Sequence, residues 1–214
     1  MLQASDTAEA FETCRAYPIS IQLPTPLRDA ELLWLSEHNA PLGFEQTAEG
    51  VLIVTPPTGS RGNRGELELI TQLVIWNKRV TFGEIRGISG GVLLPKGGQY
   101  QADAFAIAAG IWSEVPMEAR DDGYPPALPT AAFELISPGN LTATGFTKEF
   151  EKKLADYVRS AVPLVLLLQP KSESATIRRS GYADEATEAK ILAFPELPGL
   201  ELDVSAIYAA CNKP

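Results

Sequence analysis

Two carboxylates and one lysine stand out because of the segments that carry them. Asp103 lies near the start of the small-residue segment QADAFAIA, and Glu134 interrupts an apolar run from Ala131 to Ile136. A buried carboxylate has to be paired, protonated or bound to a metal. Two strand carboxylates that meet at one edge of a sheet would offer oxygen ligands for Mg²⁺ or Mn²⁺, which polarise a phosphoryl oxygen and activate a water. Lys153, in the segment FEKKLADY, would orient that water or offset charge in the transition state.

Each of these residues also has an ordinary structural explanation. Asp103 alone reads as a solvated acid at the start of a strand, and Lys153 as a solvated helix residue close to Lys148 and Lys152. A fourth acid, Glu68, begins a helical segment, where a negative charge is favourable without any function. Residue spacing by itself leaves both explanations open.

The single histidine, His38, restricts the mechanisms open to a hydrolase. No serine lies in a GxSxG elbow, so a serine–histidine triad is not expected. Cys14 and Cys211 lie near the two ends of the chain without a CxxC motif, which argues against a zinc site and a disulfide framework. Any hydrolysis is therefore expected to depend on carboxylates, lysines and metal.

The composition predicts one globular domain, and the two isolated cysteines predict a reducing cytoplasm. The chain has 214 residues, 45% of them hydrophobic, and a net charge of −9. No stretch approaches the roughly 20 apolar residues that span a bilayer, and the first twenty residues lack the pattern of a secretory signal. The negative balance argues against a broad basic surface for nucleic acid, yet it allows a local basic groove and suits a metal-binding acidic cluster.

The hydrophobic pattern predicts the elements that would position these residues. Residues 1–28 are expected to form an irregular arm, and residues 29–214 a single domain. Helices are predicted over residues 29–38, 66–79 and 147–160 and from Ser205 onward, the third with Phe150, Leu154, Tyr157 and Val158 facing inward. Strands are predicted over 50–57, 82–87, 90–95, 101–108, 130–137, 163–170, 173–181, 189–194 and 199–205. This order predicts an α/β fold with a central mixed β-sheet flanked by helices, in which the apolar segment 163–170 is a central strand.

Two local features need separate interpretation. Segments 82–87 and 90–95 read as the strands of a hairpin, with the turn KGGQ following at 96–99. The glycine-rich segment TGSRGNRG at 58–65 lacks the GK[ST] of a Walker loop. It is expected to be a flexible connection, and the alternative is a loop that holds a DNA phosphate through Arg61 and Arg64.

Five segments in order resemble one family. They are GVLIVTPPTGSRGNRGELELITQLVIWNK, LPKGGQYQADAFAI, FELISPGN, EKKLADYVRSAVPLVLLLQPK and FPELPGLELDVSAIY, spread from about Leu27 to Tyr208. Together they resemble the Uma-two family of restriction-endonuclease-like proteins, within the PD-(D/E)xK nuclease superfamily. The resemblance implies a restriction-endonuclease-like core and a Mg²⁺- or Mn²⁺-dependent endonuclease that hydrolyses phosphodiester bonds in DNA.

The same resemblance implies roles for four residues. Glu68 matches the glutamate of the family's N-terminal helix, Asp103 its strand aspartate, Glu134 its strand glutamate and Lys153 the lysine of the following helix. The three acids would be metal ligands, and Lys153 would assist the nucleophile. Ala102 replaces the family's usual proline, and Ile136 stands where the superfamily has its strand lysine. We expect Lys153 to reach the same space because its side chain is long and flexible.

Two other functions stay open on the sequence. The acidic balance and the absent strand lysine favour a catalytically inactive, nuclease-derived domain that binds nucleic acid or a protein partner. The same acids would also suit a metal-dependent hydrolase of a smaller phosphoester. The superfamily further implies a homodimer, whose two sites would suit cleavage of both DNA strands.

Overall fold

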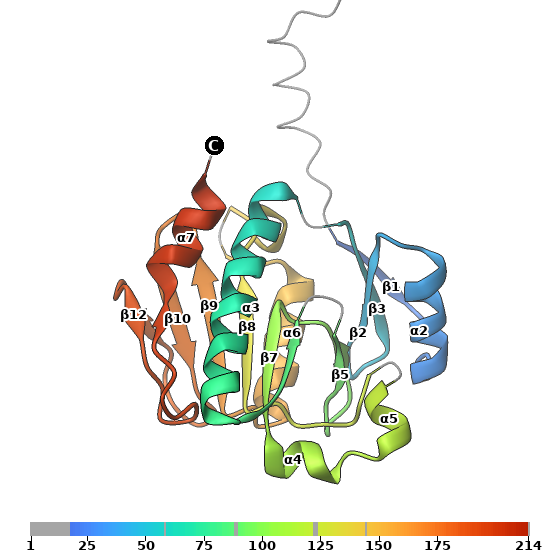
Figure 1. Cartoon of the computed structure of the whole chain (residues 1–214). Coiled ribbons are helices and arrows are strands. Elements are labelled where there is room, and N and C mark those ends of the chain that lie inside the picture. The colour runs from blue at the N-terminus through green and yellow to red at the C-terminus, as the bar shows by residue number, and fades with distance from the viewer. Residues whose placement is uncertain (1–17, 58, 88–89, 122–123, 144, 214) are drawn as a thin grey trace, which may run out of the picture.

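A computed structural model of the chain describes residues 18–57, 59–87, 90–121, 124–143 and 145–213. Two larger sheets and one two-stranded sheet are surrounded by helices (Figure 1). The strands are β1 (Ile19–Gln22), β2 (Gly43–Gln46), β3 (Val51–Thr55), β4 (Gly83–Gly87), β5 (Val92–Leu93), β6 (Gln99–Tyr100), β7 (Ala104–Ala108), β8 (Ala131–Leu135), β9 (Leu164–Gln169), β10 (Ser174–Arg178), β11 (Glu185–Thr187), β12 (Ile191–Leu192) and β13 (Leu202–Asp203). The helices are α2 (Asp29–His38), α3 (Ser60–Val80), α4 (Ala109–Glu114), α5 (Met117–Asp121), the 3₁₀ turn η1 (Pro138–Asn140), α6 (Lys148–Arg159) and α7 (Val204–Asn212).

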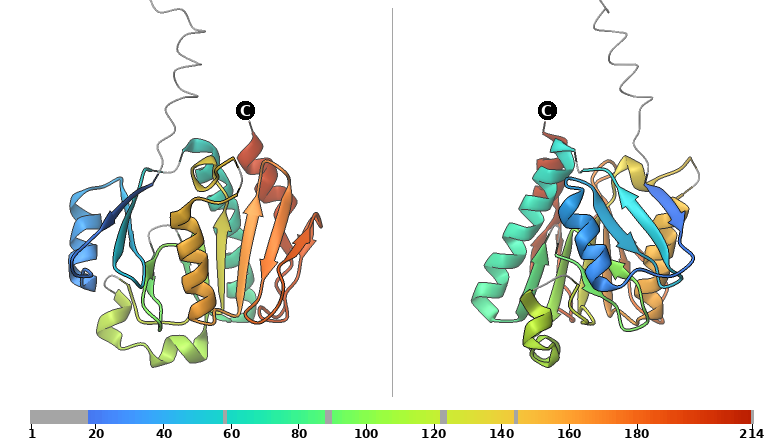
Figure 2. Two further views of the ribbon diagram at one scale, coloured as in Figure 1. Left: turned by 180° about the vertical axis from the view of Figure 1, so that it is seen from behind. Right: turned by 90° about the vertical axis from the view of Figure 1, so that its right-hand side faces the viewer.

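The six-stranded sheet, in the order β11-β10-β9-β8-β7-β4, is the mixed sheet that the sequence predicts. Strands β8 and β9 are parallel and are joined through α6, whereas the other neighbours are antiparallel. The apolar strand β9 lies inside the sheet, as predicted. Helix α3 crosses the front of this sheet in Figure 1, and the view from behind in Figure 2 shows α6 on the opposite face.

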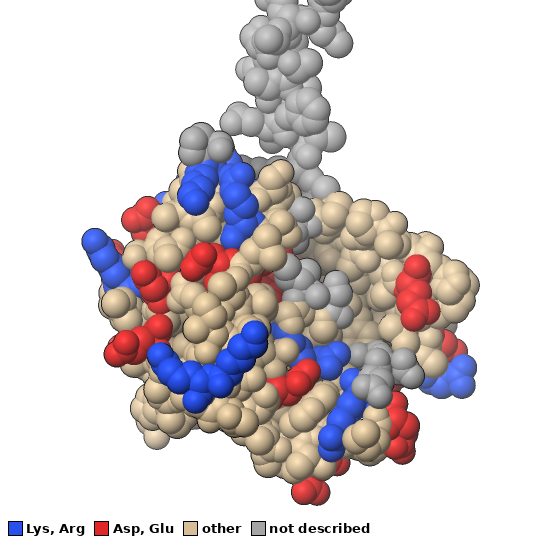
Figure 3. All heavy atoms as spheres, in the orientation of Figure 1, with Lys and Arg blue, Asp and Glu red and all other residues tan. Residues whose placement is uncertain are grey.

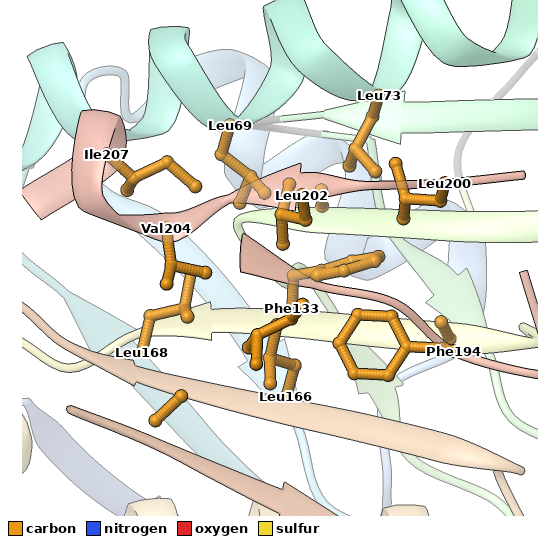
Figure 4. Close-up of a cluster of buried hydrophobic side chains, with 14 of the residues drawn as sticks. Leu69, Leu73, Phe133, Leu166, Leu168, Phe194, Leu200, Leu202, Val204 and Ile207 are labelled. Atoms are coloured by element: carbon orange, nitrogen blue, oxygen red, sulfur yellow. The ribbon is translucent and has the colours of Figure 1, made fainter. Parts of the chain in front are cut away.

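Two apolar layers hold the helices on the sheet. Leu69, Leu73 and Trp76 of α3 recur at helical spacing and are buried with residues of α7 and of the strands beneath, as Figure 4 shows for Leu69 and Leu73. On the other face, Phe150 and Leu154 of α6 are buried against alternate residues of the same strands. Val158, predicted to face inward as well, is instead 43% exposed.

The five-stranded sheet, in the order β1-β3-β2-β6-β5, lies beside α6 and carries α2 on its outer side (Figure 2). Its edge strand β1 pairs with β3, so the predicted irregular arm is wrong for residues 19–22, while residues 1–17 lie outside the described part. The predicted hairpin of residues 82–87 and 90–95 is also wrong. Strand β4 pairs with β7 and β5 with β6, because the chain leaves one sheet for the other between them.

Residues 60–65 of the glycine-rich segment do not form the predicted loop, because α3 begins at Ser60. Gly65 explains why the helix uses glycine there. A Cβ on this residue would lie 2.1 Å from Sγ of Cys211 and 2.8 Å from Cδ2 of Leu135, so the close contact of α3 with α7 and β8 requires a residue without a side chain. Arg64 donates to the carbonyl groups of Ala210 and Lys213, which fastens α7 to α3.

Within the described residues, no helix is long and apolar enough to cross a membrane.

Candidate active site

Asp103 and Glu134 lie at the same end of the six-stranded sheet. The antiparallel register of β7 and β8 pairs Ala104 with Phe133, so the next positions, Asp103 and Glu134, are cross-strand neighbours. Oδ2 of Asp103 accepts a hydrogen bond of 2.5 Å from the main-chain N–H of Leu135. Glu134 is buried on the sheet face that α6 covers, since its neighbours Ala132 and Ile136 pack on that side.

Helix α6 directs Lys153 into the space beside these acids. Its side chain is only 7% exposed, and its Nζ lies 2.9 Å from Oε1 of Glu134. Nζ also donates to Oε1 of Glu45 and to the carbonyl oxygen of Gln101, both at 2.9 Å. Three oxygens thus match the three N–H groups of the ammonium, which explains how a lysine is accommodated in a buried position.

Tyr157, one turn after Lys153 on α6, binds the same carboxylate. Its hydroxyl donates a hydrogen bond of 2.8 Å to Oε1 of Glu134. Burial raises the pKa of Tyr157 well above its ordinary value, and the charge of Glu134 raises it further, so the phenol remains a proton donor at neutral pH. Its ring makes edge contacts with Tyr100 and Phe105, which hold it in this orientation.

Burial and like charge keep both carboxyl groups hard to ionise. Burial raises the pKa of Glu134 to about 7; Lys153 opposes this shift, and the charges of Asp103 and Glu45 add to it. Burial and the charge of Glu66 likewise raise the pKa of Asp103 to about 7. For Lys153, burial lowers the pKa, but Glu134 and Glu45 more than offset it and the pKa lies above its ordinary value. The site therefore combines one permanent cation with a surplus of acids.

The acid that α3 contributes to this cluster is Glu66, whereas the sequence points to Glu68. Glu66 is buried, and its charge raises the pKa of Asp103. Glu68 lies about 200° further around the helix, at roughly 100° per residue, and accepts a hydrogen bond of 3.0 Å from Gln72. The amide of Gln72 also binds the main chain of Asp203, so this pair serves the contact with β13.

Three residues of the site were missed or assigned another role from the sequence. Glu66 falls on the stripe that Leu69 and Leu73 define, so helical phase was a usable signal for choosing it over Glu68. Tyr157 was assigned to the core, and only its hydroxyl contact reveals a second role. No local sequence pattern indicated Glu45, because its partner Lys153 lies 108 residues away in the sequence.

The donor set suits a hard divalent cation. Across the described part of the chain, no three His, Cys, Asp or Glu side chains are grouped to hold a metal ion. Mg²⁺, however, is commonly held by one or two carboxylates together with water and substrate phosphates. Asp103 and Glu134 offer two carboxylates whose pKa is raised by burial and by neighbouring negative charge, so a cation between them would relieve an existing repulsion. The residues therefore fit Mg²⁺ or Mn²⁺.

Comparison with known proteins agrees with this architecture. The sequence profile of the Uma2 family, described as "Putative restriction endonuclease", matches residues 31–205. A solved structure from Anabaena variabilis, described as a "putative nuclease belonging to DUF820", superposes with a TM-score of 0.65 at 14% identity, over 87% of this chain and 99% of that one. No curated protein matches the chain. Because the family profile spans most of its length, the chain belongs to the Uma2 family of restriction-endonuclease-like proteins.

Proposed function

We propose that this protein is a metal-dependent endonuclease that hydrolyses phosphodiester bonds in DNA. The observation that supports this most strongly is the contact of Lys153 with Glu134, one strand away from Asp103. Family membership supports a nuclease, and the metal and the substrate are our own inference from the site.

The carboxylates of Asp103 and Glu134 would hold the cation. Lys153 and Tyr157 both bind Oε1 of Glu134, and the main-chain N–H of Leu135 binds Oδ2 of Asp103. These contacts orient the two carboxylates. Glu66 comes from α3, on the sheet face opposite α6, and would support the cation by its charge. When bound, the cation would polarise the phosphoryl oxygen and lower the pKa of a water molecule.

The other roles in the reaction belong to protein side chains. Because the pKa of Lys153 is raised, its ammonium stays protonated and acts as a fixed positive charge rather than as a general base. That charge would offset the negative charge that grows on the phosphoryl oxygens as water attacks phosphorus and the bond to the leaving oxygen breaks. Asp103 and Glu134 would hold the cation as ionised carboxylates, because a neighbouring positive charge favours their charged form, and the proton that the water releases would pass to solvent.

A DNA substrate needs contacts with phosphates beyond the reacting one. Figure 3 shows the face of the molecule that carries α3. On that face, Lys and Arg side chains are interspersed with Asp and Glu and form no continuous basic surface. Binding would therefore depend on a few well-placed cations. Arg86 of β4 is one, since it pairs across the sheet with Phe105, two residues from Asp103. Such diagonal neighbours are about 7–8 Å apart, so Arg86 lies next to Asp103 on the same face of the sheet.

Arg86 differs from the nearby Arg120 in the contacts of its guanidinium. It lies over the ring of Trp112, with Cζ 5.8 Å from the ring centroid. Burial lowers its pKa, and its Nε is buried without a hydrogen-bond partner among the described residues, so a phosphate would have to bind the terminal NH₂ groups. Arg120, on the same tryptophan, instead donates to two main-chain carbonyl groups. We therefore assign Arg86, and not Arg120, to a DNA phosphate.

Cleavage of supercoiled plasmid tests the proposed function. Wild-type protein and Glu134→Ala are incubated with Mg²⁺, Mn²⁺ or EDTA, and nicked and linear products are measured. Nicking by the wild type alone, and only with metal, is expected. Equal behaviour of the two proteins under every condition would remove the nuclease assignment, and DNA binding without cleavage would favour an inactive binding domain.

A further inference from the structure

The five-stranded sheet contributes a side chain to the candidate active site. Glu45 of β2 is buried at 7% exposure. Its Oε1 accepts hydrogen bonds from Nζ of Lys153 at 2.9 Å and from the main-chain N–H of Gln101 at 2.8 Å. Lys153 is thus held between a glutamate of each sheet, Glu45 and Glu134.

One glutamate is enough to neutralise the lysine. Either Glu134 or Glu45 alone would form a neutral buried pair with Lys153, and the two carboxylates together leave the group with a net negative charge when both are ionised. Burying a further charge is costly in free energy. What Glu45 adds is geometry, because with Glu134 and the Gln101 carbonyl it defines the position of Nζ from three directions.

The sheet also has other contacts that hold it on α6. The main-chain N–H of Ala48 donates to Oδ2 of Asp156 at 2.9 Å. Further along, Glu49 forms an ion pair of 2.8 Å with Arg159. These contacts and that of Glu45 follow α6 at intervals of three residues, so the β2–β3 hairpin is held at two other points when the Glu45 contact is weakened.

We propose that Glu45 is a positioning residue, which holds the ammonium of Lys153 beside the Asp103–Glu134 pair. The five-stranded sheet is then part of the active site and not only a flanking element. This inference rests on the proposed nuclease function, in which Lys153 acts on the phosphoryl group.

The matched pair Glu45→Gln and Glu49→Gln tests this proposal. Both variants replace glutamate by glutamine on the same hairpin and beside the same helix, but Glu49 contacts Arg159 instead of Lys153. The first readout is the ammonium NMR signal of ¹⁵N-labelled Lys153, assigned by its loss in Lys153→Gln. A buried ammonium with three acceptors exchanges slowly with water and gives a resolved signal. We expect Glu45→Gln to shift or broaden it and Glu49→Gln to leave it unchanged.

The second readout is steady-state cleavage of a DNA oligonucleotide. Glu45→Gln is expected to lower kcat by about 10–100-fold, as the loss of a supporting contact typically does, with little change in KM. For Glu49→Gln, kcat should stay within about twofold of the wild-type value. If Glu45→Gln folds poorly, Glu45→Asp keeps the charge but withdraws the carboxylate from Nζ, and it should perturb the same signal.

The two readouts separate the possible failures. An unchanged Lys153 signal in Glu45→Gln and Glu45→Asp would overturn the positioning role, whatever the cleavage rate. Equal losses of kcat in Glu45→Gln and Glu49→Gln would also overturn it, because both would then act only through the hairpin. A perturbed signal in a protein that cleaves no DNA with any metal would show that the proposed function, and with it the catalytic meaning of Glu45, is wrong while the contact is real.

Discussion

Glu134→Gln should stabilise the metal-free protein at alkaline pH. The pKa of Glu134 is about 7 in the folded protein and 4.5 in an ordinary glutamate, a difference of about 2.5 pH units. At about 1.36 kcal/mol per unit, this group alone costs the wild type about 3 kcal/mol above pH 7. The folded state holds the extra proton between these two pKa values, so the wild type loses this stability as pH rises from about 4.5 to 7.

Glutamine avoids that loss. It keeps an oxygen for Tyr157, and it leaves Lys153 in a neutral pair with Glu45. The variant should therefore match the wild type near pH 4.5 and exceed it by about 3 kcal/mol at pH 8, which corresponds to roughly 6–12 °C in Tm for a domain of this size. Urea unfolding at several pH values, in EDTA, measures the difference.

Glu49→Gln is the control for this prediction, because it also removes a glutamate charge. Glu49 is an exposed acid whose pKa is lowered by its hydrogen bond with Arg159, so Glu49→Gln should give no gain at pH 8. If the difference between wild type and Glu134→Gln is the same at pH 4.5 and pH 8, or if the variant is less stable at pH 8, the account of a carboxylate held under charge repulsion is wrong.

Three further outcomes are expected. In calorimetric titration of Mg²⁺, Glu66→Gln should weaken binding several-fold, because the negative charge of Glu66 acts on Asp103, a proposed metal ligand. Glu68→Gln should leave binding unchanged, because Glu68 is bound to Gln72 instead. Arg86→Gln should reduce the slope of log DNA affinity against log salt concentration by about one, as measured by fluorescence anisotropy. Lys78→Gln, at the exposed C-terminal end of α3, should leave this slope unchanged. Gly65→Ala should lower the free energy of unfolding by about 1–3 kcal/mol through overpacking against α7, and an unaltered urea midpoint would contradict that contact.

Part of the site could be predicted because its residues break a local pattern. Glu134 interrupts an apolar strand, and Asp103 begins a strand that pairs beside it. The contact of Lys153 required more than the pattern, because a helix lysine normally reaches solvent, and only the family resemblance directed it inward. The choice between Glu66 and Glu68 depended on helical phase, which the buried leucines of α3 define.

The remaining features depend on pairing between distant segments. The hairpin prediction failed because β4 finds its partner in β7, beyond the β5–β6 hairpin of the other sheet. Glu45 was missed for the same reason, since its partner lies on α6. The glycine-rich start of α3 was misread because glycine serves there to admit α7, and local turn chemistry carries no information about that packing.

The most direct test of the account is reversible control of DNA cleavage by metal. Metal-stripped protein is mixed with supercoiled plasmid, Mg²⁺ is added, and EDTA is added after a fixed interval. We predict no nicking before Mg²⁺, steady nicking after it and an immediate stop with EDTA, with Asp103→Asn inactive throughout. Nicking that continues in EDTA, or that Asp103→Asn retains, would contradict the claim that Asp103 and Glu134 form a metal-dependent nuclease centre.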